Sequence, residues 1–142
     1  MKKVVLISCG SQKATKAVQA KDMYTSTLFK KSYAYAVQLH PDKIYILSAK
    51  YGLLDPNKTI APYDMTLNKM NSAERKQWAN KVLKQMVAAG LDLENDEFTI
   101  LAGKKYYDDL AEKGNIVKYQ IPLANKIFGE RLHYLNEVLK AH

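Results

Sequence analysis

The stretch Val4-Val5-Leu6-Ile7-Ser8-Cys9-Gly10-Ser11-Gln12-Lys13 decides the fold class of this 142-residue chain. Its first four residues are apolar and mostly β-branched, which is typical of a short buried strand. Ser8 to Lys13 then brings small and polar residues, which are typical of a turn. The stretch therefore predicts a buried strand that ends in a polar loop.

Similar apolar runs alternate with helical patterns along the rest of the chain. Further strands are predicted at residues 44–47, 98–101 and 116–121, and helices at 25–40, 71–89, 106–113 and 126–140. This alternation predicts an α/β fold, a Rossmann-like three-layer sandwich with a mostly parallel sheet of four to five strands. No linker or repeat interrupts the pattern, so residues 1–142 are expected to form a single α/β domain.

Local signals refine these helices. Ser26 is a candidate N-cap, and Asn71 with Glu74 fits a capping box. The spacing predicts that Leu28, Tyr35 and Leu39 share one face of the helix at 25–40. It likewise predicts Trp78, Val82 and Met86 as the core stripe of the helix at 71–89. The segment from 48 to 70 is rich in turn formers and is expected to be a loop.

Composition excludes several classes of protein. With 47% hydrophobic and 25% charged residues, the chain is of ordinary globular type. It has no apolar run long enough to span a membrane. A single cysteine cannot form an internal disulfide, which fits a reducing compartment, so a cytoplasmic location is expected. No cluster of residues has metal-ligand spacing, so we expect no metal and no cofactor.

Positive charge is concentrated in the first part of the chain. The net charge is +8, and residues 1–60, with ten lysines and three aspartates, carry +7 of it. Such a bias favours an anionic partner, a nucleotide or a nucleic acid, although solubility alone also explains it. The excess is almost entirely lysine, so bidentate reading of bases is not indicated.

The polar clusters fall where each predicted strand ends. Open α/β sheets bind ligands at the carboxyl ends of their strands, so these loops are the predicted site. No P-loop or GxGxxG motif is present. The tyrosines among these residues are suited to stacking on a base. The candidate ligand-binding residues are Ser8, Ser11, Lys13, Tyr24, Ser48, Lys50, Tyr51, Gly52, Gly103 and Tyr106.

Three residues are candidates for catalysis. Asp64 is the best-placed carboxylate for acid–base work, with Asp22 as the alternative, and Tyr63 precedes Asp64. Cys9 lies in a basic, Gly-containing loop that favours a reactive thiolate, but no histidine is near it in the predicted layout. The alternatives are that Asp64 caps a turn and that Cys9 is a small buried residue.

Several strings resemble a family of small uncharacterised bacterial and phage domains, whose motifs read SCS-K, YTS-LF, LSAK-GL and PYD-TL. The matching strings are ISCGSQK (7–13), DMYTSTLFKKSYAYA (22–36), IYILSAKYGLLDPNKTIAPYDMTL (44–67), LAGKKYYDDL (101–110) and IPL (121–123). The central string also resembles part of the YaaA family, which is linked to peroxide stress and DNA binding. Gly10 replaces a common serine, and Phe128-Gly129 replaces a common Gly-x-Gly turn.

These resemblances imply a role in nucleic-acid modification or damage. Together with the residues above, they predict a nucleotide- or nucleic-acid-directed enzyme acting at a nucleobase or glycosidic bond. Lys13 and Lys50 are expected to hold phosphate, with Tyr51 and Tyr63 against the nucleoside. Ser8, Lys50, Tyr51 and Asp64 are expected to line one concavity. The alternative is a non-catalytic DNA- or nucleotide-binding module.

Overall fold

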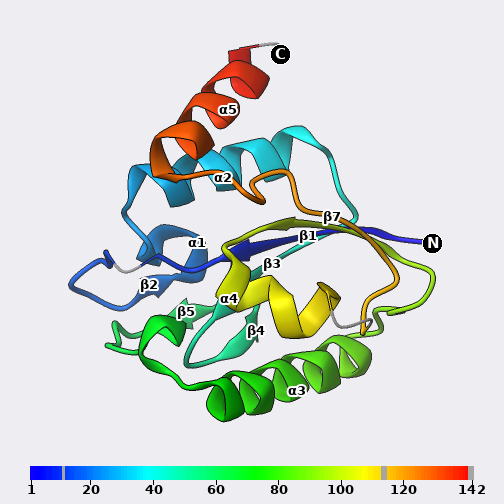
Figure 1. Cartoon of the computed structure of the whole chain (residues 1–142). Coiled ribbons are helices and arrows are strands. Elements are labelled where there is room, and N and C mark those ends of the chain that lie inside the picture. The colour runs from blue at the N-terminus through cyan, green and yellow to red at the C-terminus, as the bar shows by residue number, and fades with distance from the viewer. Residues whose placement is uncertain (11, 113–114, 141–142) are drawn as a thin grey trace.

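The computed structural model describes residues 1–10, 12–112 and 115–140 and is built on a five-stranded sheet (Figure 1). Its strands are β1 (Lys3–Ser8), β3 (Lys43–Ser48), β4 (Gly52–Leu54), β6 (Glu97–Leu101) and β7 (Lys118–Gln120), in the order β4-β3-β1-β6-β7. β1 runs parallel to β3 and β6, and β6 runs parallel to β7, whereas β4 is antiparallel to β3. The α/β class and the mostly parallel sheet are therefore confirmed.

Helices cover both faces of this sheet (Figure 1). On one side are α2 (Thr27–Gln38) and α5 (Phe128–Lys140); on the other are α3 (Ser72–Ala88), α4 (Lys104–Tyr107) and the π-helix η2 (Asp108–Glu112). Each side has its own apolar cluster. Because successive side chains of a strand point to opposite faces, Leu6 packs with Trp78 while Ile7 packs with Phe29. The central strand thus supplies both halves of the core.

The predicted starts of two helices, α2 and α3, are confirmed in atomic detail. The Phe29 N–H donates to the Ser26 hydroxyl at 3.2 Å, which caps α2. At the start of α3, Asn71 and Glu74 form both hydrogen bonds of a capping box. α3 ends at Ala88, two residues before Gly90, whose φ of +85° suits glycine. Its buried residues include Trp78, Val82 and Met86, as predicted.

The predicted apolar face of α2 is confirmed only in part. Leu28 and Tyr35 are half-buried and pack against the core, but Leu39 is 39% exposed, and the fully buried residues of α2 are Phe29, Ser32 and Ala36. α2 packs between the sheet and α5, and small side chains on the inner face allow the helix to approach closely. A count of large apolar residues misses such a face because serine and alanine contribute little to it.

The predicted bounds of several short elements also need correction. The fourth strand is only Lys118–Gln120 and is exposed at the sheet edge. The helix after β6 begins at Lys104 and continues into η2. The supposed loop at 48–70 contains β4, β5 (Thr59–Ile60) and the 3-10 helix η1 (Leu67–Lys69). β5 pairs with β2 (Val18–Gln19), which leads into α1 (Ala20–Met23). Elements of two to five residues are too short to show a sequence period.

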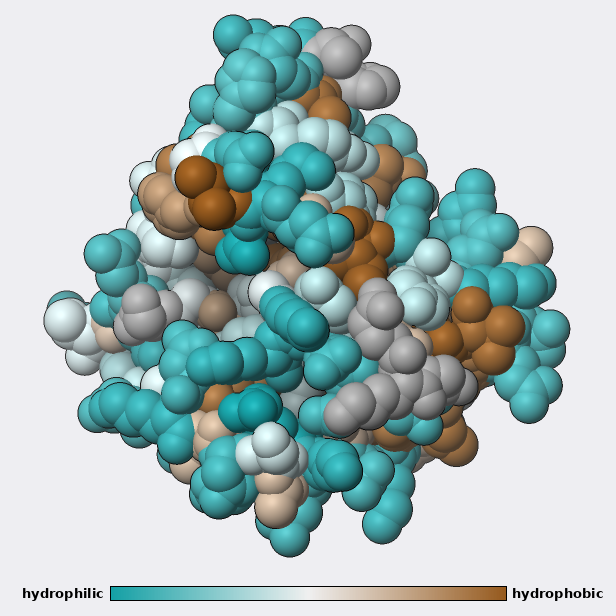
Figure 2. Space-filling view, viewed as in Figure 1, coloured by the Kyte–Doolittle hydropathy of each residue, from teal (hydrophilic) through white to brown (hydrophobic). Residues whose placement is uncertain are grey.

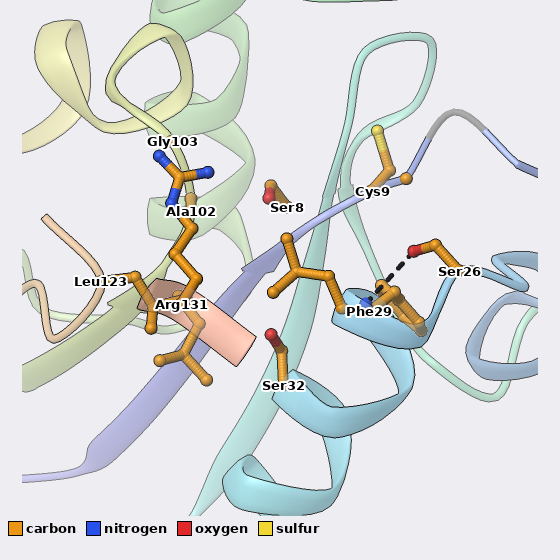
Figure 3. Close-up of a pocket in the computed structure, with 12 residues that line it drawn as sticks. Ser8, Cys9, Ser26, Phe29, Ser32, Ala102, Gly103, Leu123 and Arg131 are labelled. Carbon is orange, nitrogen blue, oxygen red and sulfur yellow. Dashed lines mark hydrogen bonds between the residues drawn. The ribbon is translucent and has the colours of Figure 1, made fainter. Parts of the chain in front are cut away.

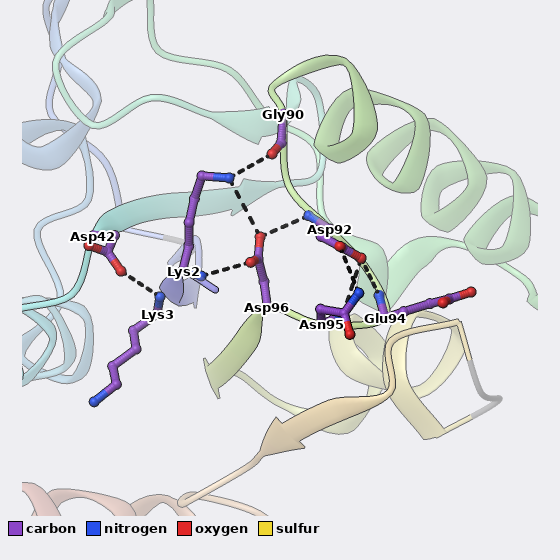
Figure 4. A network of polar contacts seen from close by, with 8 residues as sticks. All are labelled: Lys2, Lys3, Asp42, Gly90, Asp92, Glu94, Asn95 and Asp96. Carbon is purple, nitrogen blue, oxygen red and sulfur yellow. Dashed lines mark hydrogen bonds and ion pairs between the residues drawn. The ribbon is translucent and has the colours of Figure 1, made fainter.

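A polar network closes the amino ends of β1 and β6 (Figure 4). The Asp96 carboxylate is 2% exposed and accepts the N–H groups of Lys2 at 2.7 Å and Asp92 at 2.8 Å. These two hydrogen bonds, the one from Asp92 first, lower the pKa of Asp96. The Lys2 ammonium donates to the Gly90 carbonyl at 2.9 Å. This edge of the sheet is therefore fastened by its own polar groups.

The surface of the side seen in Figure 1 is mainly hydrophilic, with apolar atoms gathered in a few small patches (Figure 2). Among the described residues, no helix is long and apolar enough to cross a bilayer. The largest exposed apolar side chains include Ile127 and Phe128, at the start of α5.

Candidate functional site

The strand order reverses beside β1. The chain passes from β1 to β3 on one side and later enters β6 on the other, so the reversal lies between β1 and β6. Loops that leave the two strands in opposite directions open a crevice at such a point. Two cavities lie at this edge, and Cys9 and Gly10, which follow β1, line both of them.

The larger cavity has a volume of about 450 Å³, which suits a small organic ligand. It combines two ammonium groups, a carboxylate, a thiol and a phenol. Its lining residues are Cys9, Gly10, Lys13, Asp64, Met65, Thr66, Asn68, Lys69 and Tyr106. Asp64 is exposed and Lys13 is half-buried. This wall can attract an anion and place a carboxylate beside it.

Tyr63, which precedes Asp64, is held by a chain of hydroxyl groups. Its hydroxyl lies 2.6 Å from that of Tyr24 and 2.8 Å from that of Ser48. The Tyr51 N–H also donates to the Ser48 hydroxyl, at 3.0 Å. Burial raises the pKa of Tyr24 to about 12 and raises the pKa of Tyr63 well above its ordinary value. Both phenols therefore stay protonated at neutral pH.

Tyr24 and Ser48 serve this network from the interior. Tyr24 is 1% exposed and Ser48 is fully buried, so neither side chain is accessible to a ligand. The Lys13 ammonium lies 4.6 Å from the centre of the Tyr63 ring, within the range of a cation–π contact. The network therefore fixes the segment that carries Asp64 and positions Lys13 at the cavity wall.

Cys9 and Tyr106 form a second contact across the site. The Cys9 thiol lies 3.3 Å from the Tyr106 hydroxyl, and burial raises the pKa of Tyr106. The Tyr106 ring packs edge-on against Trp78, whose indole N–H donates to the Ser48 carbonyl at 2.9 Å. No histidine is among the described residues that line either cavity. Cys9 thus has a phenol rather than an imidazole as its neighbour.

The expectation that Ser8, Lys50, Tyr51 and Asp64 line one concavity is wrong. Asp64 lines the larger cavity and Ser8 the smaller one, while Lys50 is exposed and lines neither. The Lys50 ammonium lies 5.3 Å from the ring centre of Tyr51, and the Lys50 carbonyl accepts a hydrogen bond from the Lys81 ammonium. The cause is the tight hairpin from β3 to β4, which carries Lys50 to the outer edge of the sheet.

Tyr51 and Gly52 have structural roles in this hairpin. The Tyr51 ring packs edge-on against Tyr63 at 5.6 Å. Gly52 has a φ of +74°, and the Gln85 side chain beside it accepts the Leu53 N–H at 2.8 Å and donates to the Tyr51 carbonyl at 3.0 Å. Glycine is favoured there because other residues rarely adopt this backbone conformation.

The smaller cavity has a volume of about 50 Å³ and lies between the ends of β1 and β6 (Figure 3). It includes the predicted residues Ser8 and Gly103. Ser26, Ser32 and Arg131 also line it, and none of them was predicted as a site residue. Arg131 carried one signal, since the chain has only two arginines. Ser11, another predicted ligand-binding residue, lies outside the described residues.

Within the described residues, no group of three or more histidine, cysteine, aspartate or glutamate side chains is placed to hold a metal ion. The site is thus a cation-bearing pair of cavities at the carboxyl edge of an α/β sheet.

Residues 4–137 match DUF6884, a family of unknown function, and the chain belongs to that family. No curated protein and no solved structure matches it.

Proposed function

We propose that the protein binds a nucleotide or a short nucleic-acid segment in the larger cavity and acts on its base or glycosidic bond. In this proposal the fold is Rossmann-like and the site uses its strand ends in the usual way for such folds. The observation that carries the proposal is the meeting of Lys13, Lys69, Asp64 and Tyr106 in one cavity of about 450 Å³.

Each group has a role in this proposal. Lys13 and Lys69 attract the negatively charged ligand to the site, and the Tyr106 ring edge contacts its base or sugar. Asp64 takes a proton from a water molecule that attacks the anomeric carbon of the sugar, the bond from that carbon to the base breaks, and the base leaves with a proton from solvent. Tyr63, held by Tyr24 and Ser48, positions this carboxylate. The resemblance of residues 44–67 to the YaaA family supports a link to nucleic acids.

A screen of nucleosides, nucleotides and short DNA by thermal shift tests the binding step. A ligand at 100 times its dissociation constant should raise the free energy of unfolding by about 2.7 kcal/mol. Lys13→Met should weaken binding about tenfold or more, as expected for a lost charge-assisted hydrogen bond. Lys50→Met is the matched control, because it removes the same charge from a lysine outside both cavities. Equal losses in both variants would contradict the proposed site.

Chemistry is tested separately, by chromatographic detection of free base after incubation with the ligands that bind. Asp64→Asn should abolish product while leaving binding within a few fold. If wild-type protein binds a nucleotide but releases no product over a long incubation, the enzyme proposal fails and a binding module remains.

One observation favours that second candidate. A groove of about 320 Å³ on the side of α3 and α4 is lined by Arg75, Lys76, Lys104 and Lys105, together with Asp108, Asp109 and Ser72. Four cations in one groove suit a phosphate backbone. A DNA-binding module would show affinity that falls steeply with salt and is reduced by Lys104→Gln and Lys105→Gln. A salt-insensitive affinity would count against it.

A further inference from the structure

The smaller cavity has the features of a built anion site. It opens where strand order reverses, between Ser8 at the end of β1 and Gly103 after β6. Arg131 reaches it from α5, and no acidic side chain is among its described lining residues. Figure 3 shows the Arg131 guanidinium beside Ala102 and Gly103, facing the space that Ser8 and Ser32 also border. The charge at this cavity is therefore positive.

The start of α2 adds backbone donors. Ser26 caps the helix by accepting the Phe29 N–H, which leaves the Thr27 and Leu28 N–H groups without acceptors inside the helix. The partial positive charge at a helix start favours an anion there. Ser26 and Leu28 both line the cavity, so it lies against this end of α2.

Ser32 supplies an independent indication. It is only 3% exposed and lies one turn into the apolar inner face of α2. Its hydroxyl makes none of the side-chain hydrogen bonds found among the described residues, and it points toward the cavity (Figure 3). Since no buried side-chain oxygen or nitrogen of the described residues lacks a hydrogen-bond partner, the Ser32 oxygen is open to the cavity and can bind a group that enters it.

The volume of the smaller cavity limits the size of the ligand that it can hold. One water molecule needs about 10–15 Å³ of such volume, so a cavity of about 50 Å³ admits only a few oxygen-sized atoms. That is the size of a single tetrahedral oxyanion and is too small for a base or a sugar. The Cys9-Gly10 segment lines both this cavity and the larger one. A ligand that occupies the two cavities therefore has one part on each side of that segment.

We infer that the smaller cavity is a phosphate subsite, in which Arg131, Ser8, Ser32 and the first N–H groups of α2 bind one phosphate of a nucleotide whose remainder lies in the larger cavity. This inference rests on the proposed function and narrows it, because the substrate must then be phosphorylated. A free nucleoside lacks the group that the smaller cavity binds.

Inorganic phosphate and a matched pair, AMP and adenosine, are the probes, with binding measured by isothermal titration calorimetry. Wild-type protein should bind phosphate and should bind AMP at least tenfold more tightly than adenosine. Arg131→Gln should weaken phosphate and AMP binding about ten- to a hundredfold, and Ser32→Ala about threefold or more. Lys140→Gln is the control, since it removes one charge from the exposed far end of α5.

The outcomes separate this inference from the proposed function. If AMP and adenosine bind equally, or if Arg131→Gln and Ser32→Ala both bind phosphate as wild type does, the phosphate subsite is refuted while nucleotide binding stands. If phosphate binds and both variants lose it but no nucleoside or nucleotide binds, the proposed function is refuted and the subsite stands. Circular dichroism of each variant establishes that it is folded before binding is compared.

Discussion

Replacing Gly52 by alanine tests whether the β3–β4 hairpin is held by its backbone conformation and by Gln85. Gly52 has a φ of +74°, and an alanine Cβ would clash with the Gln85 side-chain oxygen. The left-handed conformation costs alanine about 1–2 kcal/mol. Displacing Gln85 breaks its hydrogen bonds to Leu53 and Tyr51, at about 0.5–1.5 kcal/mol each. Gly52→Ala should therefore lower the free energy of unfolding by about 2–5 kcal/mol.

Gly90→Ala is the matched control for this change. Gly90 also has a positive φ, of +85°, but its Cβ would meet nothing within 4 Å. Gly90→Ala should lower the free energy of unfolding only by the cost of the left-handed backbone conformation, about 1–2 kcal/mol. Urea unfolding followed by circular dichroism measures both variants. The clash is isolated by repeating Gly52→Ala in a Gln85→Ala background, where its cost should fall to that of Gly90→Ala. An equal cost of Gly52→Ala in both backgrounds would refute the reasoning.

Three further predictions concern the polar groups. Tyr63→Phe should lower the free energy of unfolding by about 1–3 kcal/mol, because the Tyr24 and Ser48 hydroxyls lose their partner. The control Tyr119→Phe, on exposed β7, should change it by under about 0.5 kcal/mol. Equal urea midpoints for the two variants would contradict this prediction. Burial raises the pKa of Tyr24 and of Tyr35 from 10.0 to about 12, so the folded state holds these protons more tightly. The resulting stability is complete below pH 10 and lost as pH rises to about 12, and tyrosinate absorbance should show these phenols ionising later in the folded protein than in urea. Asp96→Ala should lower the free energy of unfolding by about 1–3 kcal/mol, because it leaves the Lys2 and Asp92 N–H groups unpaired. Glu94→Ala, on the exposed side of the same turn, should leave the free energy of unfolding nearly unchanged in the same urea assay.

The main elements of the fold were predictable because their signals are local. The run from Val4 to Ile7 is short and mostly β-branched, which favours a buried strand, and the Asn71–Glu74 capping box marks the start of α3 to the residue. The inner face of α2 was not predictable, since Ser32 and Ala36 are buried by the close approach of the sheet and α5 and not by their own hydrophobicity. The same holds for β2 and β5, which exist through pairing between distant segments.

The candidate site was predictable in its location but not in its membership. Parallel strands bring the segments after β1 and β6 together, so Cys9 and Gly103 were placed at the correct edge. Lys50 was misplaced because the sequence does not reveal the hairpin that turns it outward. Arg131 was missed because it enters from a helix that ends far along the chain, and only the packing of α5 on α2 brings it to the cavity.

The central claim is that ligands bind at the two cavities on the carboxyl edge of the sheet. A titration of the protein with AMP, followed in its two-dimensional amide NMR spectrum, tests this claim most directly. The largest shifts should fall on Gly10, Gly103 and Lys69, which line the cavities, while Gly90 at the amino edge should not move. Shifts confined to Gly90 and its neighbours, or to the groove of Arg75 and Lys105, would contradict the claim.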